Sequence, residues 1–297
     1  MTAPQSIGFI GLGVMGEPIC RNLARKAGAG LFAFDLDAAP LQRLAPEGVA
    51  ACASAADIMQ RCDVVFLSLP SGEIVADLCR RPDGLLANAR AAQIVVDLST
   101  SSVKETRALA AEFAARGAEF VDAPVARTRA AAEAGTLAVM VGATPELFER
   151  VRPLIASFAS DIALCGPTGS GQVLKILNNM VLFETVVAIS EAKAIGERAG
   201  VDPEVLFKTL AQGSADSFAL RNHGMKAVLP GEFPERAFSV RYALKDLHYA
   251  LQLAEDSRVD ARGARVVQAW FTEAIEHGFG EQYHPVISRL MPQDPHP

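Results

Sequence analysis

Two polar residues stand one helical turn apart in an otherwise apolar segment of the chain. Lys175 and Asn179 occupy positions i and i+4 of the segment Gly169–Asn179, so their side chains are expected on one face of a helix. A lysine that loses solvation titrates more easily and can act as a proton donor. Lys175 is therefore the first candidate for a catalytic residue. The alternative for an isolated lysine is a surface side chain that keeps its ammonium in water.

A glycine-rich turn near the N-terminus is the second candidate site. It follows the apolar strand pattern Ile7–Ile10 and precedes a helical stretch, which is the context in which a G-x-G-x-x-G motif predicts dinucleotide binding. The glycines allow a tight turn, a close approach of pyrophosphate and close packing of helix on strand. A turn without a ligand is the alternative. The expected cofactor-binding residues of this turn are Gly11, Leu12, Gly13, Val14, Met15 and Gly16.

An acidic residue follows the second expected strand. Asp35 comes directly after Leu31–Phe34, about 20 residues beyond the glycines, where an acid accepts hydrogen bonds from the adenosine ribose. Its carboxylate would repel a 2′-phosphate, and Leu36 provides no cation to bind one. NAD is therefore favoured over NADP as the cofactor.

The first part of the chain alternates apolar runs with amphipathic stretches, which predicts βαβ units and a doubly wound sheet. After about residue 165 the pattern becomes helical, and a long helix at about 173–198 would bridge the two parts. The expected fold is α/β, with an N-terminal Rossmann-type domain over residues 1–165 and an all-helical substrate and oligomerisation domain over 166–297. The expected strands are Ile7–Ile10, Leu31–Phe34, Val64–Leu69, Ile94–Leu98, Phe120–Val121 and Thr136–Val141.

Composition excludes several classes of protein. The 297 residues are 50% hydrophobic and 21% charged, with a formal net charge of −6. The sequence contains neither a long basic run nor zinc-finger spacing, so nothing in it indicates a nucleic-acid-binding protein. The five histidines show no metal-ligand spacing. The five scattered cysteines indicate reduced thiols in a cytoplasmic protein. No signal peptide and no apolar run long enough to span a bilayer are expected, and the tail Pro292–Pro297 is expected to fray.

Five motifs occur in a characteristic order. They are GLGVMGEP at 11–18, DLST at 97–100, DAPV at 122–125, GSGQVLKILNN at 169–179 and Lys245-Asp246-Leu247. Together they resemble the β-hydroxyacid dehydrogenase family, which includes 3-hydroxyisobutyrate dehydrogenases and tartronate semialdehyde reductases and is similar to 6-phosphogluconate dehydrogenase. The resemblance covers nearly the whole chain.

The resemblance implies roles for single residues. Lys175 matches the catalytic lysine of the family, and Asn179 matches an asparagine that helps to hold the substrate. Thr100 matches a position near the nicotinamide, and Lys245 matches a lysine that reaches the cofactor. The loop with Leu69 and Pro70 is expected to pass along the cofactor. Proteins that look like this are usually homodimers or homotetramers built through the helical domain.

One loop departs from the family pattern. After Asp-Ala-Pro-Val the family usually has Ser-Gly-Gly, whereas this chain has Ala126-Arg127-Thr128. The guanidinium of arginine presents a planar fork of donors to a carboxylate, sulfonate or phosphate, so Arg127 and Thr128 are expected to bind the substrate anion. The loop is similar to the Gly-Arg-Thr form of sulfolactaldehyde reductases. The alternative is that Arg127 points to solvent or pairs with an acid such as Glu133.

These observations predict an NAD-dependent oxidoreductase. It would interconvert a small anionic 3-hydroxy acid, or a hydroxy-sulfonate, and its aldehyde or ketone, with Lys175 as general acid and base. Three alternatives stay open: an NADPH-using β-hydroxy amino acid dehydrogenase, a dinucleotide-binding module without turnover, and imine or amine chemistry. The presence of Lys175 favours the enzyme.

Overall fold

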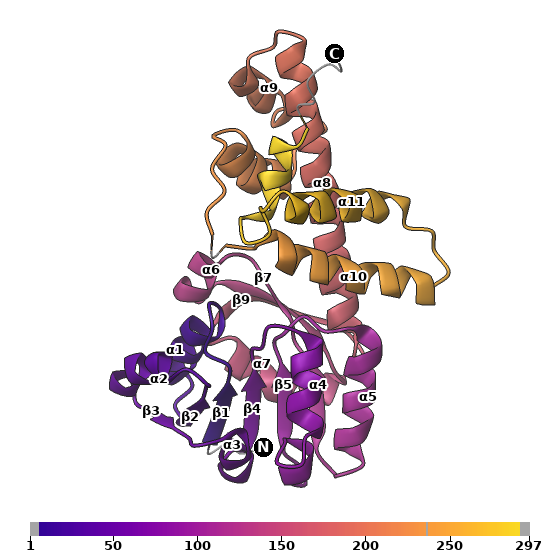
Figure 1. Ribbon diagram of the computed structural model, residues 1–297. Helices are drawn as coiled ribbons and strands as arrows, with labels where there is room; N and C mark the ends of the chain where they lie inside the picture. The colour runs from indigo at the N-terminus through magenta and orange to yellow at the C-terminus, as the bar shows by residue number, and fades with distance from the viewer. Residues whose placement is uncertain (1–5, 236, 292–297) are drawn as a thin grey trace. The chain divides into compact units, whose positions relative to one another are not determined.

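The computed structural model describes residues 6–235 and 237–291, so the tail that was expected to fray lies outside the described residues. The chain divides into two compact units, Met1–Lys175 and Ile176–Pro297. The division falls inside helix α8 (Ser170–Arg198), whereas the sequence placed the boundary at residue 165, just before this helix. Figure 1 shows the strands and helices of each unit.

The first unit contains a nine-stranded sheet in the order β3-β2-β1-β4-β5-β6-β8-β7, with β9 paired to β8. The strands from β3 to β6 are parallel, which confirms the predicted doubly wound fold. Their bounds are β1 (Ser6–Ile10), β2 (Gly30–Phe34), β3 (Val49–Ala51), β4 (Val64–Leu67), β5 (Ile94–Asp97) and β6 (Glu119–Asp122).

Both faces of the parallel sheet are covered. Along β4, Val64 and Phe66 belong to one hydrophobic cluster, and Val65 and Leu67 belong to another. Because successive side chains of a strand point to opposite faces, the two clusters are the cores on the two sides of the sheet. Helices α1 and α7 contribute to the first core, and helices α3, α4 and α5 to the second. The bounds are α1 (Gly16–Lys26), α2 (Ala38–Leu44), α3 (Ala55–Arg61), α4 (Gly72–Arg80), α5 (Val103–Ala114) and α7 (Pro145–Ile155).

The sheet ends in an antiparallel extension. Strand β8 (Leu137–Gly142) pairs antiparallel with β6 and β7 and parallel with β9. The sequence predicted a strand at β8, but it did not predict β7 (Val125–Ala126), β9 (Ala159–Gly166) or helix α6 (Arg129–Ala134). Strand β7 has only two residues, and most of β9 is not buried, so neither produces an apolar run in the sequence.

The second unit is built from helices around one apolar core, as predicted. Its largest fully buried side chains are Phe183, Phe207 and Phe271. The extended pairing found among its described residues consists of two isolated bridges, Glu235 with Gln282 and Ser239 with Tyr283. Besides the rest of α8, the elements are α9 (Pro203–Leu210), the π-helix η3 (Leu220–Val228), α10 (Val240–Asp256), α11 (Arg262–Glu276) and the 3-10 helix η4 (His284–Arg289).

Two histidines are part of this core. The Tyr283 hydroxyl hydrogen-bonds to Nδ1 of His223 on the π-helix, and His284 is fully buried against the rings of Phe183 and Phe238. Burial lowers the pKa of His223 to about 4 and holds the pKa of His284 well below its usual range. Within the described part of the chain neither ring nitrogen of His284 has a hydrogen-bond partner. Both imidazoles are therefore neutral packing groups at neutral pH.

Helix α8 is unusually apolar. Its 29 residues contain a window of mean hydropathy 1.5 that is 39% buried, which is enough by length and composition to cross a membrane. The expectation that no apolar run reaches this length is therefore wrong for α8. Core helices of water-soluble proteins pass the same test. Exposed apolar side chains of α8 are Leu174, Leu177, Val181 and Ile195.

Candidate active site

The glycine turn between β1 and α1 has the geometry that a phosphate-binding turn requires. Gly11 has a φ of +93°, and a Cβ there would collide with the carbonyl oxygen of Ser68. A Cβ on Gly16 would collide with the carbonyl oxygen of Gly11, whereas a Cβ on Gly13 would meet nothing within 4 Å. The turn is thus closed at both ends and open at Gly13, where pyrophosphate would approach the backbone.

Asp35 lies against this turn. Its Oδ2 accepts a hydrogen bond from the backbone amide of Leu12 at 2.5 Å, and its Oδ1 accepts one from the amide of Asp37 at 2.8 Å. The next residue, Leu36, is 95% exposed. The structure therefore brings together the glycine turn and the carboxylate that the sequence assigned to the ribose. This arrangement fits a bound dinucleotide.

The open space at Gly13 leads to a testable prediction. Gly13→Ala should leave the unliganded protein as stable as the wild type, or about 0.4–1 kcal/mol more stable, because the unfolded chain loses freedom. The added methyl group would occupy the approach of the pyrophosphate, so the dissociation constant for NADH should rise about tenfold or more, which is about 1.4 kcal/mol. Thermal unfolding and fluorescence titration with NADH measure the two effects.

A contrasting variant separates the two roles of the glycines. Gly16→Ala should lose stability even without nucleotide, because its Cβ would collide with Gly11. Unchanged NADH affinity in Gly13→Ala would contradict the assignment of this turn to the pyrophosphate.

The loops after β4 and β5 are joined to each other. The backbone amide of Leu69 donates to Oγ of Ser99 at 2.9 Å, and Thr100 is 6% exposed. Strands β1 and β4 are neighbours in the sheet, and the strand order runs outward from them in opposite directions. This is the topological switch point of the sheet, and ligands of such sheets bind there, beyond the carboxyl ends of the strands. The predicted residue Leu69 lies beside the glycine turn, because a Cβ on Gly11 would be 2.9 Å from its side chain. Thr100 lies in the adjoining loop after β5, and Pro70 is exposed.

Two buried aspartates end neighbouring strands. Asp97 and Asp122 are register partners in β5 and β6 and are fully buried. Asp97 accepts hydrogen bonds from the amide of Ser99 at 2.9 Å and from the hydroxyl of Ser101 at 3.1 Å. Burial raises the pKa of each carboxyl to about 6, so both are ionised acceptors at neutral pH. Both aspartates belong to sequence motifs, DLST and DAPV, but neither had a role predicted from the sequence.

Asp122 holds the first turn of helix α8. Its Oδ1 accepts from the amide of Gly169 at 2.6 Å, and its Oδ2 accepts from the amide of Gln172 at 2.9 Å. These are free amides of a helix N-terminus, which a carboxylate stabilises. Lys175 follows one turn later and is only 9% exposed. The surface alternative for this lysine is therefore not what the structure shows.

Asn179 and Lys245 are both bound to one buried carboxylate in the second unit. Nδ2 of Asn179 donates to Oδ2 of Asp246 at 2.7 Å, and Nζ of Lys245 lies 3.0 Å from Oδ1. Asp246 is 1% exposed. The ammonium of Lys245 also lies 4.0 Å from the centroid of the Tyr242 ring. Asp246 belongs to a sequence motif, but its contact with Asn179 was not predicted, because the two residues lie 67 positions apart in the sequence.

Arg127 has other partners than the expected substrate anion. Its guanidinium lies 2.7 Å from Oδ2 of Asp161 and donates to the carbonyl oxygen of Thr136 and to Oγ of Ser160. Its φ is +85°, a left-handed conformation that favours glycine. The acid that pairs with Arg127 is Asp161. Glu133, the acid suggested from the sequence, pairs with Arg129 at 2.9 Å. Substrate binding by this guanidinium stays a prediction that requires it to leave Asp161.

Thr128 has a structural contact. Its Oγ1 accepts a hydrogen bond from the amide of Ala131 at 3.4 Å and so caps the N-terminus of α6. The residue is exposed. Its expected contact with substrate also stays a prediction.

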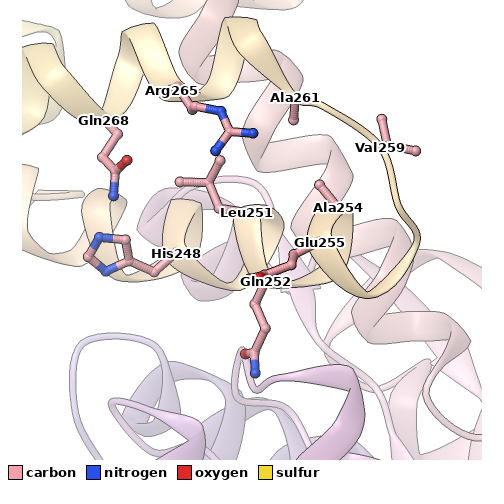
Figure 2. Close-up of a pocket in the computed structure, with 9 residues that line it drawn as sticks. All are labelled: His248, Leu251, Gln252, Ala254, Glu255, Val259, Ala261, Arg265 and Gln268. Carbon is pink, nitrogen blue, oxygen red and sulfur yellow. The ribbon is translucent and has the colours of Figure 1, made fainter.

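A hollow elsewhere in the second unit contains none of the predicted site residues. It has a volume of about 420 Å³ and lies between α10 and α11 (Figure 2). His248 lines it together with Arg265 and Gln268. Among the described residues no group of histidine, cysteine and acidic side chains could hold a metal ion.

Two family models together match almost the whole chain. The NAD-binding domain of 6-phosphogluconate dehydrogenase matches residues 6–166, and the NAD-binding domain of NADP-dependent 3-hydroxyisobutyrate dehydrogenase matches residues 169–291. The chain belongs to the β-hydroxyacid dehydrogenase family. The resemblance that the five motifs indicated is thus confirmed. A member of this family is an oxidoreductase with a nucleotide-binding domain for NAD or NADP.

Named relatives of this family member cover nearly its full length. The 2-(hydroxymethyl)glutarate dehydrogenase of Eubacterium barkeri is 35% identical over 97% of this chain and 95% of its own. The NAD-dependent L-serine dehydrogenase of Pseudomonas aeruginosa is 33% identical over 97% and 98%. The solved 3-hydroxyisobutyrate dehydrogenase of Mycobacterium tuberculosis, with L-serine, has a TM-score of 0.88 at 30% identity, covering 97% and 99% of the chains. These similarities support oxidoreduction between hydroxy acids and semialdehydes.

Proposed function

We propose that this protein is an NAD-dependent dehydrogenase that interconverts a small anionic 3-hydroxy acid and its aldehyde, with Lys175 as general acid and base. The observation that carries the proposal is the placement of Lys175. It is buried on a helix whose first turn is held by Asp122, and the side chain of Gln172 in that turn binds the backbone on both sides of Thr100. The lysine is thereby held at a fixed distance from the expected nicotinamide loop.

The protein has to orient the substrate and transfer one proton. The bound nicotinamide supplies or accepts the hydride at its C4. In reduction, the ammonium of Lys175 donates a proton from Nζ to the oxygen of the forming alkoxide. In oxidation, the neutral amine takes the proton of the substrate hydroxyl. The positive charge also stabilises the oxyanion that develops during hydride transfer.

Asn179 is proposed to contact the hydroxyl or carboxylate of the substrate. It lies one helical turn beyond Lys175, so the two side chains leave the same face of α8. Asp246 accepts a hydrogen bond from Nδ2 of Asn179 and so fixes the orientation of the amide. The side chain of Lys245 is proposed to contact the bound cofactor.

The proposed substrate class is a 3-hydroxypropanoate with a substituent at C2. The names 2-(hydroxymethyl)glutarate, L-serine and 3-hydroxyisobutyrate each describe a carboxylate with a hydroxymethyl group on its α-carbon. The argument for a sulfonate depended on the guanidinium of Arg127, which here binds Asp161. A carboxylate substrate is therefore favoured over a hydroxy-sulfonate.

The choice of NAD over NADP rests on Asp35 and is tested by comparing the two cofactors. NADH should be preferred to NADPH by about tenfold or more in kcat/KM, because a like-charge contact with the 2′-phosphate costs at least 1.4 kcal/mol. Asp35→Ser should reduce this preference. Asp37→Ser removes a nearby carboxylate but keeps an oxygen that can cap Ala39 at the start of α2, so it is the matched control and should leave the preference unchanged. A wild-type preference for NADPH would overturn the assignment.

We further propose a homodimer or homotetramer in the cytoplasm. Leu174, Val181 and Ile195 are exposed on α8 at multiples of seven residues, so they form a stripe along the helix that is suited to packing against a helix of a second copy. Free cysteines, of which Cys20, Cys52, Cys62 and Cys79 are buried, fit a reducing compartment.

A further inference from the structure

The side chain of Gln172 joins helix α8 to the loop after β5. Gln172 is fully buried. Its Nε2 donates to the carbonyl oxygen of Ser99 at 2.8 Å, and its Oε1 accepts from the amide of Ser101 at 3.1 Å. Both ends of the amide thus bind the backbone on either side of Thr100. No other orientation of the amide satisfies both backbone groups, because the donor and the acceptor would then face groups of the same kind.

The helix on which Gln172 lies is held from a second direction. Asp122, at the end of β6, accepts from the amides of Gly169 and Gln172. A Cβ on Gly171 would collide with the carbonyl oxygen of Met140 and would lie 2.9 Å from Oδ2 of Asp122. The first turn of α8 is therefore pressed closely onto the sheet. A small shift of the helix would break hydrogen bonds both to the loop after β5 and to Asp122 at the end of β6.

The loop that Gln172 binds is itself fixed. The hydroxyl oxygen of Ser99 accepts a hydrogen bond from the backbone amide of Leu69, and the backbone amide of Ser99 donates one to the carboxylate of Asp97. The hydroxyl of Ser101 donates to the same carboxylate at 3.1 Å. One continuous set of hydrogen bonds thus runs from the loop after β4, through the loop around Thr100, to the first turn of α8.

We propose that Gln172 is a positioning residue that sets the distance between Lys175 and the loop of Thr100. This role rests on the proposed function, in which Lys175 transfers the proton and Thr100 lies near the nicotinamide. Lys175 follows Gln172 by three residues on the same helix, which is about 4.5 Å along the axis. The bonds of Gln172 therefore fix the lysine against the loop, and hydride and proton transfer depend steeply on such distances.

The experiment compares two buried glutamines of the first unit. Gln172→Met and Gln172→Glu each remove the bond from Nε2 to Ser99. Gln93→Met is the matched control, because Gln93 is 2% exposed and its Nε2 also donates to two carbonyl oxygens, those of Met59 and Cys62, away from the predicted site residues. Each variant is measured for thermal unfolding, for kcat and KM, and for the primary isotope effect with NADH deuterated at C4.

For both Gln172 variants we expect kcat to fall about 10- to 100-fold, since a displacement near 1 Å costs up to about 10²-fold. The KM values should change little, and the isotope effect on kcat should rise because hydride transfer becomes slower than product release. Amide exchange at Ser101 should also be faster in Gln172→Met, because methionine has no oxygen to accept from this amide, and this readout needs no turnover. Gln93→Met should lose stability with kcat and isotope effect unchanged.

Two results would overturn the role of Gln172. One is a wild-type kcat and isotope effect in both Gln172 variants, with wild-type Ser101 exchange in Gln172→Met. The other is an equal loss of kcat in Gln93→Met, which would make the effect one of general stability. Absence of turnover in the wild-type protein would contradict the proposed function itself, and the wild-type measurement in the same assay detects that outcome separately.

Discussion

Lys175→Ala is expected to lower turnover by about 10²–10⁴-fold, the usual contribution of a positioned general acid or base. The dissociation constant for NADH should stay near that of the wild type, because the glycine turn and Asp35 do not involve this lysine. Steady-state kinetics and fluorescence titration with NADH measure the two quantities. Lys193→Ala is the matched control, since Lys193 lies on the same helix and pairs with Glu197 at 2.8 Å. Retained activity in Lys175→Ala would remove Lys175 from the mechanism.

Lys175→Arg separates proton transfer from charge. Arginine keeps the positive charge that stabilises an oxyanion, but it cannot lose its proton in a protein. We therefore expect oxidation of the alcohol, which needs a neutral base, to be impaired at least as strongly as in Lys175→Ala. Oxidation at the wild-type rate would show that the base is another group.

Asp246→Ala is expected to have the largest effect on stability. The substitution removes a carboxylate that is 1% exposed and leaves Lys245 and the amide of Asn179 without this partner. Breaking a buried ion pair from one side costs about 3–5 kcal/mol, and the partial exposure of Lys245 favours the lower end of this range. Denaturant unfolding followed by circular dichroism measures the change in the free energy of unfolding.

The matched control for Asp246 is an exposed acid on a helix of the same unit. Glu197→Ala breaks the pair with Lys193 and should change the free energy of unfolding by less than about 1 kcal/mol. Equal stabilities of Asp246→Ala and the wild type would contradict the structural importance of this carboxylate.

The parts of the fold that sequence reasoning found are those with a strong local pattern. Strands β4 and β5 were predicted because their apolar runs are buried on both faces, and β1 and β2 because they too are short apolar runs. Strand β3 has three residues of which one is buried, and β9 is mostly not buried, so neither has a pattern that differs from a loop. Strand β9 is placed by its pairing with β8, which depends on residues that the local sequence does not contain.

The candidate site was predictable where chemistry and spacing are local. The glycine turn, Asp35 and the pair Lys175 and Asn179 could be recognised from residue type and spacing. The roles of Gln172 and Asp122 could not, because their partners lie 47 to 73 residues away. The motif DAPV contained the only signal for Asp122, an acid at the end of an apolar strand.

Arg127 is a residue whose role was predicted from its type, although a partner distant in the sequence occupies its side chain. Its residue type favours an anion in the substrate site, but its ion-pair partner Asp161 lies on β9, a strand that was not predicted. The left-handed backbone at Arg127 costs about 1–3 kcal/mol in a residue other than glycine. The three contacts of its guanidinium with residues 136, 160 and 161 offset this cost.

The most direct test of the account is consumption of NADH by the wild-type protein with a panel of small aldehydes, paired with NAD reduction on their alcohols. The panel includes methylmalonate semialdehyde, tartronate semialdehyde and sulfolactaldehyde, with 3-hydroxyisobutyrate and L-serine for the reverse reaction. We expect turnover with at least one carboxylate substrate that has a hydroxymethyl or formyl group on its α-carbon, and loss of that turnover in Lys175→Ala. NADH binding without turnover on any member of the panel would contradict the account and favour a dinucleotide-binding module.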